Sequence, residues 1–273
     1  MSIADINNAI GQTVNASEHG GLVDHMLGFV HWFMLALFIG WSAFLAYCFW
    51  RFRAKNHPKA DYHGVRSHAS THVEIGVVIV ETILLLGFAF PLWSRQADDY
   101  PTSPDTIKMR ALGEKFLWNF QYPGNDLMIS SWHLSNISAT NQTGRDLGDP
   151  NGKDDFVNPG TMKLPVGRPV IVDVASKDVI HNLALVPMRA AQDATPGVKS
   201  HMWFKPVKTG TWEIICGQLC GPGHAQMKGF LEVVDAKEFD EWSAEQSKAA
   251  AAKSAAPAAP PVPVAGPVAA PAK

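Results

Sequence analysis

Several shortages narrow the class to which this 273-residue protein belongs. Only three cysteines are present, Cys48, Cys216 and Cys220, and an odd count this low does not make a disulfide framework. The formal net charge is −2 and basic residues form no patch, so the composition does not indicate a nucleic-acid-binding protein. Residues 1–25 contain no lysine or arginine, whereas a cleaved signal peptide begins with positive charge. We therefore expect the apolar segment that follows residue 25 to be retained.

Charged residues are also scarce in two long apolar runs. Residues 26–50 contain no Asp, Glu, Lys or Arg, and Glu81 is the only one of these residue types in residues 75–93. About 20 apolar residues of helix cross a bilayer core, so both runs predict membrane-spanning helices, over about 26–50 and 74–94. Buried helices of a soluble protein are the competing interpretation, but these are usually shorter. The sequence thus predicts a helix hairpin over residues 26–96.

The distribution of positive charge predicts how this hairpin is oriented. Basic residues are concentrated in the connection between the two runs: Arg51, Arg53, Lys55, Lys59 and Arg66. The positive-inside rule places this connection in the cytoplasm and both termini on the outer side. We expect a multi-pass protein of a bacterial inner membrane, with residues 1–25 and everything after the second span in the periplasm.

Residues 98–243 have the pattern of a compact β domain. Short runs rich in β-branched and aromatic residues alternate with turns that contain Gly, Pro, Asn or Asp. These runs cover residues 107–112, 116–122, 170–175, 180–186, 211–216 and 229–234. No helical periodicity is long enough to supply a crossover helix. The expected fold class is therefore two N-terminal transmembrane α-helices followed by an all-β sandwich or Greek-key barrel.

Two further segments have a different composition. Residues 133–160 are polar and rich in glycine, which predicts a long surface insertion. Residues 244–273 are rich in alanine and proline and have few side chains that could form a core. Such a composition predicts a disordered tail. Neither segment indicates a function.

The strongest chemical signal is the segment from residue 216 to residue 227, CGQLCGPGHAQM. It brings together two thiols, an imidazole and a thioether, from Cys216, Cys220, His224 and Met227. These soft or borderline ligands suit copper, whereas magnesium, calcium and manganese prefer the carboxylates that this segment lacks. Zinc prefers four Cys or His ligands, and methionine would be unusual for it. The segment therefore predicts a copper site.

Each of these residues, taken singly, has an ordinary explanation. The two cysteines could form a disulfide, although so short a loop would gain little stability from chain entropy. Methionine is most often a core residue. The combination at this spacing favours a metal. A single-copper site uses one cysteine with two histidines and often a methionine, so the additional thiol indicates two copper ions bridged by sulfur.

A second imidazole ligand should come from elsewhere in the β domain. His181 closes the segment DVIH, which begins with Asp178 at the start of an expected strand. His201 and His133 are the alternatives, and spacing alone does not separate the three. A lone histidine on an apolar strand is more often a core residue with satisfied hydrogen bonds.

The DVIH segment and the C-x3-C-x3-H-x2-M loop, preceded by two membrane helices, resemble subunit II of cytochrome c oxidase over about residues 20–245. The resemblance implies a cupredoxin-like domain with a dinuclear copper centre, called CuA. The implied ligands are the backbone carbonyl of Gln218 and the side chains of His181, Cys216, Cys220, His224 and Met227. The family usually has Glu at position 218, where the carboxylate also reaches a magnesium ion shared with subunit I. Glutamine keeps the carbonyl ligand of copper but removes this carboxylate.

The resemblance also implies a function and partners. The chain would accept electrons from cytochrome c or a similar donor and pass them to the haem of subunit I. Oxygen is reduced to water there, and the reaction is coupled to proton translocation. The implied partners are subunit I with its haem and copper, subunit III, the electron donor and the lipid bilayer.

Three residues are candidates for electron or proton transfer by the same resemblance. The family accepts electrons at an aromatic stretch, which corresponds here to residues 116–122. Trp118 is retained, but Phe116 stands where the family has its first tryptophan. Glu74 lies at about the place where a family glutamate feeds protons into a channel of subunit I. The competing interpretation of Glu74 is a solvated carboxylate at a helix N-terminus.

Two other classes of protein remain as alternatives. A quinol oxidase subunit II shares the fold but lacks the copper ligands, none of which is missing here. A membrane-anchored copper carrier or assembly protein would bind copper without needing the aromatic stretch. Nitrous oxide reductase has a similar centre in a much larger soluble protein.

Overall fold

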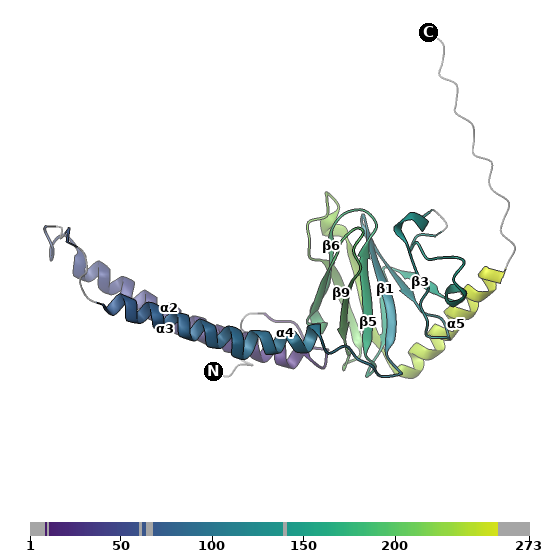
Figure 1. Cartoon of the computed structure of the whole chain (residues 1–273), viewed down its shortest axis with the longest axis horizontal. Helices are drawn as coiled ribbons and strands as arrows, with labels where there is room; N and C mark the ends of the chain where they lie inside the picture. The colour runs from purple at the N-terminus through teal and green to yellow at the C-terminus, as the bar shows by residue number, and fades with distance from the viewer. Residues whose placement is uncertain (1–8, 10, 60–61, 64–67, 139–140, 256–273) are drawn as a thin grey trace, which may run out of the picture.

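The computed structural model describes residues 9, 11–59, 62–63, 68–138 and 141–255. Two long helical rods lie side by side and extend from one end of a β domain (Figure 1). The first rod is α2, Gly20–Phe52. The second consists of α3, Ala69–Leu84, a π-helical turn η1, Leu85–Ala89, and α4, Phe90–Ala97. Arg66, part of the predicted basic connection, lies outside the described residues.

Both rods are longer than the spans predicted for them. They contain 33 and 29 residues, and each is long and apolar enough to cross a membrane. The first rod begins at Gly20, where the hydroxyl of Ser17 accepts a hydrogen bond from the Gly20 amide over 3.1 Å. The second continues to Ala97, next to the β domain. The predicted spans end where the apolar runs end. The helices extend further, because helical hydrogen bonding continues through the polar residues next to the β domain.

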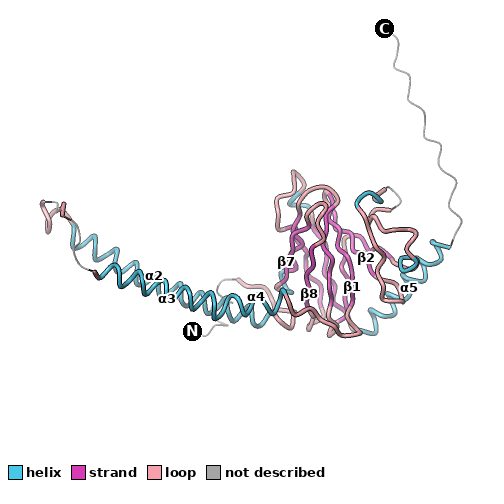
Figure 2. Tube along the Cα trace, viewed as in Figure 1, coloured by secondary structure: helices cyan, strands magenta, loops and turns pink. Residues whose placement is uncertain are grey.

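The β domain is a sandwich of two five-stranded sheets (Figure 2). One sheet has the order β3-β2-β1-β5-β8 and the other β4-β10-β9-β6-β7. The strands of the first sheet are β1, Ile107–Glu114, β2, Leu117–Tyr122, β3, Phe156–Pro159, β5, Val170–Ser176, and β8, Ser200–Phe204. Those of the second are β4, Thr161–Pro165, β6, His181–Leu185, β7, Ala190–Ala194, β9, Gly210–Cys216, and β10, Lys228–Val234. All six predicted strands are present.

The core of the sandwich is formed by alternate side chains of the two sheets. Val172 from β5 and Leu183 from β6 are fully buried, as is Ile214 from β9. Strands β1 and β5 pair in parallel, as do β10 and β4, while the other paired strands run antiparallel. Both faces of the core are therefore provided by strands, as the sequence predicts. The loops that connect the strands at one end of the sandwich are not needed for the core and can carry a site.

The C-terminal segment corrects the predicted limit of the disordered tail. A helix, α5, runs from Ala236 to Ala255 along the β domain, so residues 244–255 are helical (Figure 1). Trp242 packs edge-on against the rings of Tyr122 and Phe156, each 5.3 Å away. Ser247 is fully buried and donates a hydrogen bond to Asp154. Composition missed this helix because a few contacts anchor a segment that is otherwise rich in alanine. Residues 256–273 lie outside the described residues.

The predicted surface insertion is also partly a structural element. Residues 156–159 form β3, which pairs with β2 at the edge of the first sheet. Two 3-10 turns precede it, η2, Leu134–Asn136, and η3, Pro150–Gly152. Asp155 is buried beneath this segment. The polar composition therefore concealed a strand and a buried polar cluster.

Candidate metal centre

The sheet places His181 and Cys216 side by side at one end of the sandwich. Cys216 is the last residue of β9, and Leu183 of β6 pairs with it in register, two residues after His181. His181 is fully buried, and its Nδ1 lies 3.9 Å from Sγ of Cys216. Two residues that are distant in sequence thus face each other because their strands are neighbours.

The loop after β9 adds the remaining sulfur and nitrogen atoms. Sγ of Cys220 lies 3.8 Å from Sγ of Cys216, 3.6 Å from Nδ1 of His224 and 3.8 Å from Sδ of Met227. The carbonyl oxygen of Gln218 lies 3.2 Å from Sγ of Cys216. A 3-10 turn, η5, His224–Gln226, directs the end of this loop into β10. All six residues predicted to bind copper therefore contribute an atom to one place.

This arrangement has the chemistry of a site for soft metal ions. The ligand atoms of His181, Cys216 and Cys220 all lie within 4.8 Å of one another, and the three residues are buried. Each thiol has an imidazole beside it, His181 for Cys216 and His224 for Cys220. Sulfur and imidazole ligands select copper or zinc, and the paired thiols can bridge two ions. The donor set fits a dinuclear copper centre.

The two cysteines are free thiols, because their sulfur atoms are 3.8 Å apart, far beyond the ~2.05 Å of a disulfide. Burial raises the pKa of the Cys220 thiol to about 11, and the neighbouring Cys216 contributes to the rise. A negative charge here is therefore unfavourable unless a cation is present. Metal binding would reverse this preference and release protons from the thiols.

Asp178 fixes the orientation of His181. Nε2 of His181 lies 2.9 Å from Oδ1 of Asp178, and the amide of Lys115 donates a hydrogen bond to the other carboxylate oxygen over 2.8 Å. Burial alone would raise the pKa of Asp178, but hydrogen bonds from His181, Lys115 and Val179 outweigh it and lower the pKa. An ionised carboxylate accepts the Nε2 proton, which leaves the lone pair of Nδ1 directed towards Cys216. The sequence contained this aspartate within DVIH but gave it no separate role.

The aromatic residues predicted to accept electrons lie beside the same site. Trp118 is fully buried in β2, and its ring meets that of His181 edge-on at 5.9 Å. Phe116 covers the loop from the other direction: a Cβ atom at Gly223 would come within 2.3 Å of its ring. A Cβ atom at Gly113 would lie 3.0 Å from both His181 and Trp118. The two glycines allow this close packing; Gly223 belongs to the segment from residue 216 to residue 227, whereas no sequence motif marked Gly113.

The other candidate residues lie away from this cluster. His201 is on β8 in the opposite sheet and pairs with Asp173 over 2.8 Å, while the exposed His133 precedes η2. Of the three histidines that spacing left open, His181 is therefore the one at the cysteines. Glu74 is exposed on α3, near the end of the helical rod that is distant from the β domain. The Gln218 residue is exposed apart from its carbonyl contact.

Comparisons with known proteins agree with this geometry. Residues 107–234 match the family described as cytochrome c oxidase subunit II, periplasmic domain. The alternative cytochrome c oxidase subunit 2 of Bradyrhizobium diazoefficiens is 31% identical over 229 residues, which cover 83% of this chain and 80% of that protein. Cytochrome c oxidase subunit 2 of Cereibacter sphaeroides is 26% identical over 230 residues, covering 79% and 73% of the two chains.

A solved structure is also similar to the β domain. The periplasmic domain of cytochrome oxidase subunit II from Bradyrhizobium japonicum shares 29% identity with this chain, covers 55% of it and 97% of that domain, and has a TM-score of 0.40. The two-sheet β domain that follows the apolar helices contains the residues that match the periplasmic-domain family. Given the extent and identity of the match to the Bradyrhizobium diazoefficiens protein, the chain belongs to the cytochrome c oxidase subunit II family.

Proposed function

We propose that this chain receives electrons from cytochrome c or a similar donor at a dinuclear copper centre and delivers them to the haem of subunit I. Membership of the family makes it a subunit of an oxidoreductase complex, a haem-copper oxidase. The observation that carries the finer proposal is the convergence of two thiols and two imidazoles within one buried cluster. When bound, the copper pair supplies a one-electron carrier.

Six residues hold the copper ions in this proposal. His181, Cys216, Cys220, His224 and Met227 provide side chains, and Gln218 provides its carbonyl oxygen. The two thiols and the two imidazoles would together hold the ions. Because the Gln218 side chain is a neutral amide, a magnesium ion shared with subunit I would have to be held without a carboxylate from this position.

The protein around the site is suited to electron transfer because it keeps the ligands rigid and dry. Asp178 holds His181 in one tautomer, and Gly113 lets Trp118 pack against the same ring. A site with fixed ligands changes redox state with little rearrangement of its surroundings. Phe116 packs on the loop at Gly223 and Trp118 on the ring of His181, and the two aromatic residues are the proposed route of electron acceptance.

The membrane part completes the proposal. The two apolar rods anchor the chain in a bacterial inner membrane, with the β domain on the periplasmic side. Subunits I and III are the proposed partners within the bilayer. Glu74 on α3, at the opposite end of the rods, is the proposed position of proton uptake towards subunit I.

The test is a visible and electron paramagnetic resonance spectrum of the full chain, purified in detergent and loaded with copper. We expect a purple species that binds two coppers and shares one unpaired electron between them. A blue spectrum from a single copper, or a chain that retains none, would contradict the dinuclear assignment. Either result would favour a copper carrier or a copper-free quinol oxidase subunit instead.

A further inference from the structure

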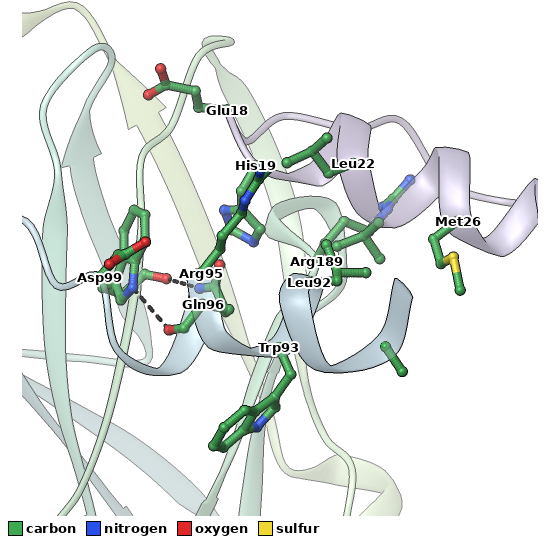
Figure 3. Close-up of a pocket in the computed structure, with 13 residues that line it drawn as sticks. Glu18, His19, Leu22, Met26, Leu92, Trp93, Arg95, Gln96, Asp99 and Arg189 are labelled. Atoms are coloured by element: carbon green, nitrogen blue, oxygen red, sulfur yellow. Dashed lines mark hydrogen bonds between the residues drawn. The ribbon is translucent and has the colours of Figure 1, made fainter. Parts of the chain in front are cut away.

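A cavity of about 610 Å³ lies where the membrane rods meet the β domain (Figure 3). Leu22 and Met26 near the beginning of α2 form one wall, and Leu92 of α4 forms part of another. Arg189 and Trp203 contribute from the β domain. The volume falls in the range of ~300–1,000 Å³ that is usual for small-molecule sites.

Hydrogen bonds give this cavity a fixed frame. The indole of Trp203 donates to the carbonyl oxygen of Gln96 over 3.0 Å, and the Gln96 side chain donates to the carbonyl oxygen of Trp203 over 2.7 Å (Figure 3). Arg189 binds Asp24 over 2.6 Å and the carbonyl oxygen of Thr13 over 2.6 Å. Hydrogen bonds thus join the β domain to both rods, and they fix the positions of the residues around the cavity.

Two oppositely charged side chains in the lining form no ion pair among the described residues. Glu18 pairs with Lys205 over 2.9 Å and Arg189 pairs with Asp24, so these charges are compensated within the protein. Arg95 and Asp99 also line the cavity, and neither has an ion-pair partner among the described residues. Among the described residues, the lining therefore contains a cation in the last turn of α4 and an anion just beyond the end of that helix, neither of which is in an ion pair.

His19 adds a polar side chain to the lining, and its ring lies 6.0 Å from that of Trp203. Both of its ring nitrogens are buried and receive no hydrogen bond. Burial lowers the pKa of His19, against smaller opposite effects from the Arg189 main chain and the Glu18 carboxylate. A neutral imidazole has one N–H donor, which a ligand in the cavity could use.

The position of the cavity, at the ends of the membrane rods, indicates the kind of ligand. Its apolar wall belongs to the outer ends of the two membrane rods, and its charges lie beside the β domain. Trp93, next in sequence to Leu92, is 61% exposed, as is common for tryptophan at a membrane surface. A ligand here meets hydrocarbon at one end and charged groups at the other.

We propose that this cavity binds a zwitterionic phospholipid with a primary amine, such as phosphatidylethanolamine. Arg95 holds the phosphate, Asp99 holds the ammonium group, and His19 donates to a glycerol ester oxygen. Leu22, Met26 and Leu92 contact the upper part of the acyl chains. The inference requires that the rods span a bilayer, and it does not depend on copper binding.

The test measures lipid binding to the full chain in detergent by native mass spectrometry. The delipidated protein is titrated with phosphatidylethanolamine and, separately, with phosphatidylglycerol, which has the phosphate but no amine. The variants are Arg95→Gln and Asp99→Asn. Lys208→Gln is the matched control, because Lys208 is an exposed cation of the β domain that does not line the cavity.

We expect one phosphatidylethanolamine to bind about tenfold more tightly than phosphatidylglycerol, the effect of one charge-assisted hydrogen bond. Arg95→Gln should weaken both lipids about tenfold. Asp99→Asn should remove the preference for the amine, and Lys208→Gln should change neither. Equal binding to all variants, a preference for phosphatidylglycerol, or no retained lipid would each overturn the proposal.

A second readout separates this inference from the proposed function. The copper spectrum of each variant reports on folding and on the metal centre at the other end of the β domain. An unchanged spectrum with lost lipid binding supports the lipid site alone. A chain that binds phosphatidylethanolamine selectively but no copper would retain the lipid site and refute the electron-transfer proposal.

Discussion

Two buried polar clusters at different places in the β domain are built on opposite principles. In the first sheet, Arg110, Gln121, Ser130 and Asp155 are all at most 3% exposed. Donors there meet acceptors: Arg110 donates to Gln121 over 3.0 Å, and Gln121 donates to Asp155 over 2.7 Å. At the metal centre, the sulfur and nitrogen atoms lie 3.6–3.9 Å apart, and the donors in these contacts are the weakly donating thiols of Cys216 and Cys220.

The difference teaches how to separate a structural cluster from a binding site. Burial of polar groups is unfavourable unless they are paired, and the Asp155 cluster supplies most of its own pairs. The thiols and imidazoles at the metal centre are only weakly paired with one another, and a cation that displaces the thiol protons would be held by all of them. Removal of residues from each cluster should therefore have different consequences, in stability for one and in metal binding for the other.

The largest expected effect is at the bridging thiols. Cys216→Ser should abolish the two-copper spectrum, because serine offers a poor ligand for a soft ion and no bridge. The variant should still fold, since the side chain keeps nearly the same volume. Copper content and the electron paramagnetic resonance spectrum are the measurements, with Cys48→Ser on α2 as the control. A normal two-copper spectrum from Cys216→Ser would show that this residue is not a ligand.

In the buried polar cluster around Asp155, we expect a loss of stability without a loss of copper. Asp155→Ala should lower the free energy of unfolding by about 3 kcal/mol, because it leaves the buried donors of Gln121 and Ser130 unpaired. The copper spectrum of the folded protein should not change. Denaturant titration measures the loss, and Asp98→Ala, at an exposed position, is the control. A stability loss below ~1 kcal/mol would mean that water satisfies these donors.

A smaller effect is expected from the residue that orients His181. Asp178→Asn should weaken copper binding about 10- to 100-fold while the dinuclear spectrum keeps its shape, because all ligands remain. Asp173→Asn is a matched control, since Asp173 also pairs with a histidine, His201, but far from the cysteines. Competition with a copper chelator measures the affinity. Equal affinities for the two variants would assign Asp178 a role in folding alone.

The smallest effect is expected where the loop from Cys216 to Met227 packs on Phe116. Gly223→Ala places a methyl group 2.3 Å from this ring and should cost about 1–3 kcal/mol of stability by overpacking. The double variant with Phe116→Ala should recover part of that loss, because the clashing ring is gone. Gly148→Ala, where the nearest atom is a flexible carboxylate at 3.3 Å, serves as the control. Additive losses in the double variant would exclude direct packing.

Local features of the sequence predicted the membrane rods, the strands and most of the candidate site. A helix long enough to span a bilayer depends on consecutive apolar residues, which any reader of the chain can count. The loop from Cys216 to Met227 is similarly local, because four of its ligand side chains fall within one turn-rich segment. The resemblance to the family implied His181 as a further ligand, although spacing alone did not separate it from His201 and His133.

Other features depended on contacts between distant residues. The helical character of residues 244–255 comes from Trp242 and Ser247 docking on the β domain, which no local composition reveals. The strand β3 in the polar insertion forms because β2 offers it an unpaired edge. In both segments tertiary contacts override a weak or contrary local preference.

The sequence by itself therefore predicted which residues could bind a metal ion and where the two long apolar helices lie, because spacing and hydrophobicity are properties of neighbouring residues. Only the tertiary structure decided which of three histidines faces Cys216, since the pairing of β6 with β9 brings His181 there. It also decided that Asp178 holds that histidine and that Arg95 and Asp99 line one cavity. Those relations exist only when distant parts of the chain pack together, and packing is set by the whole fold.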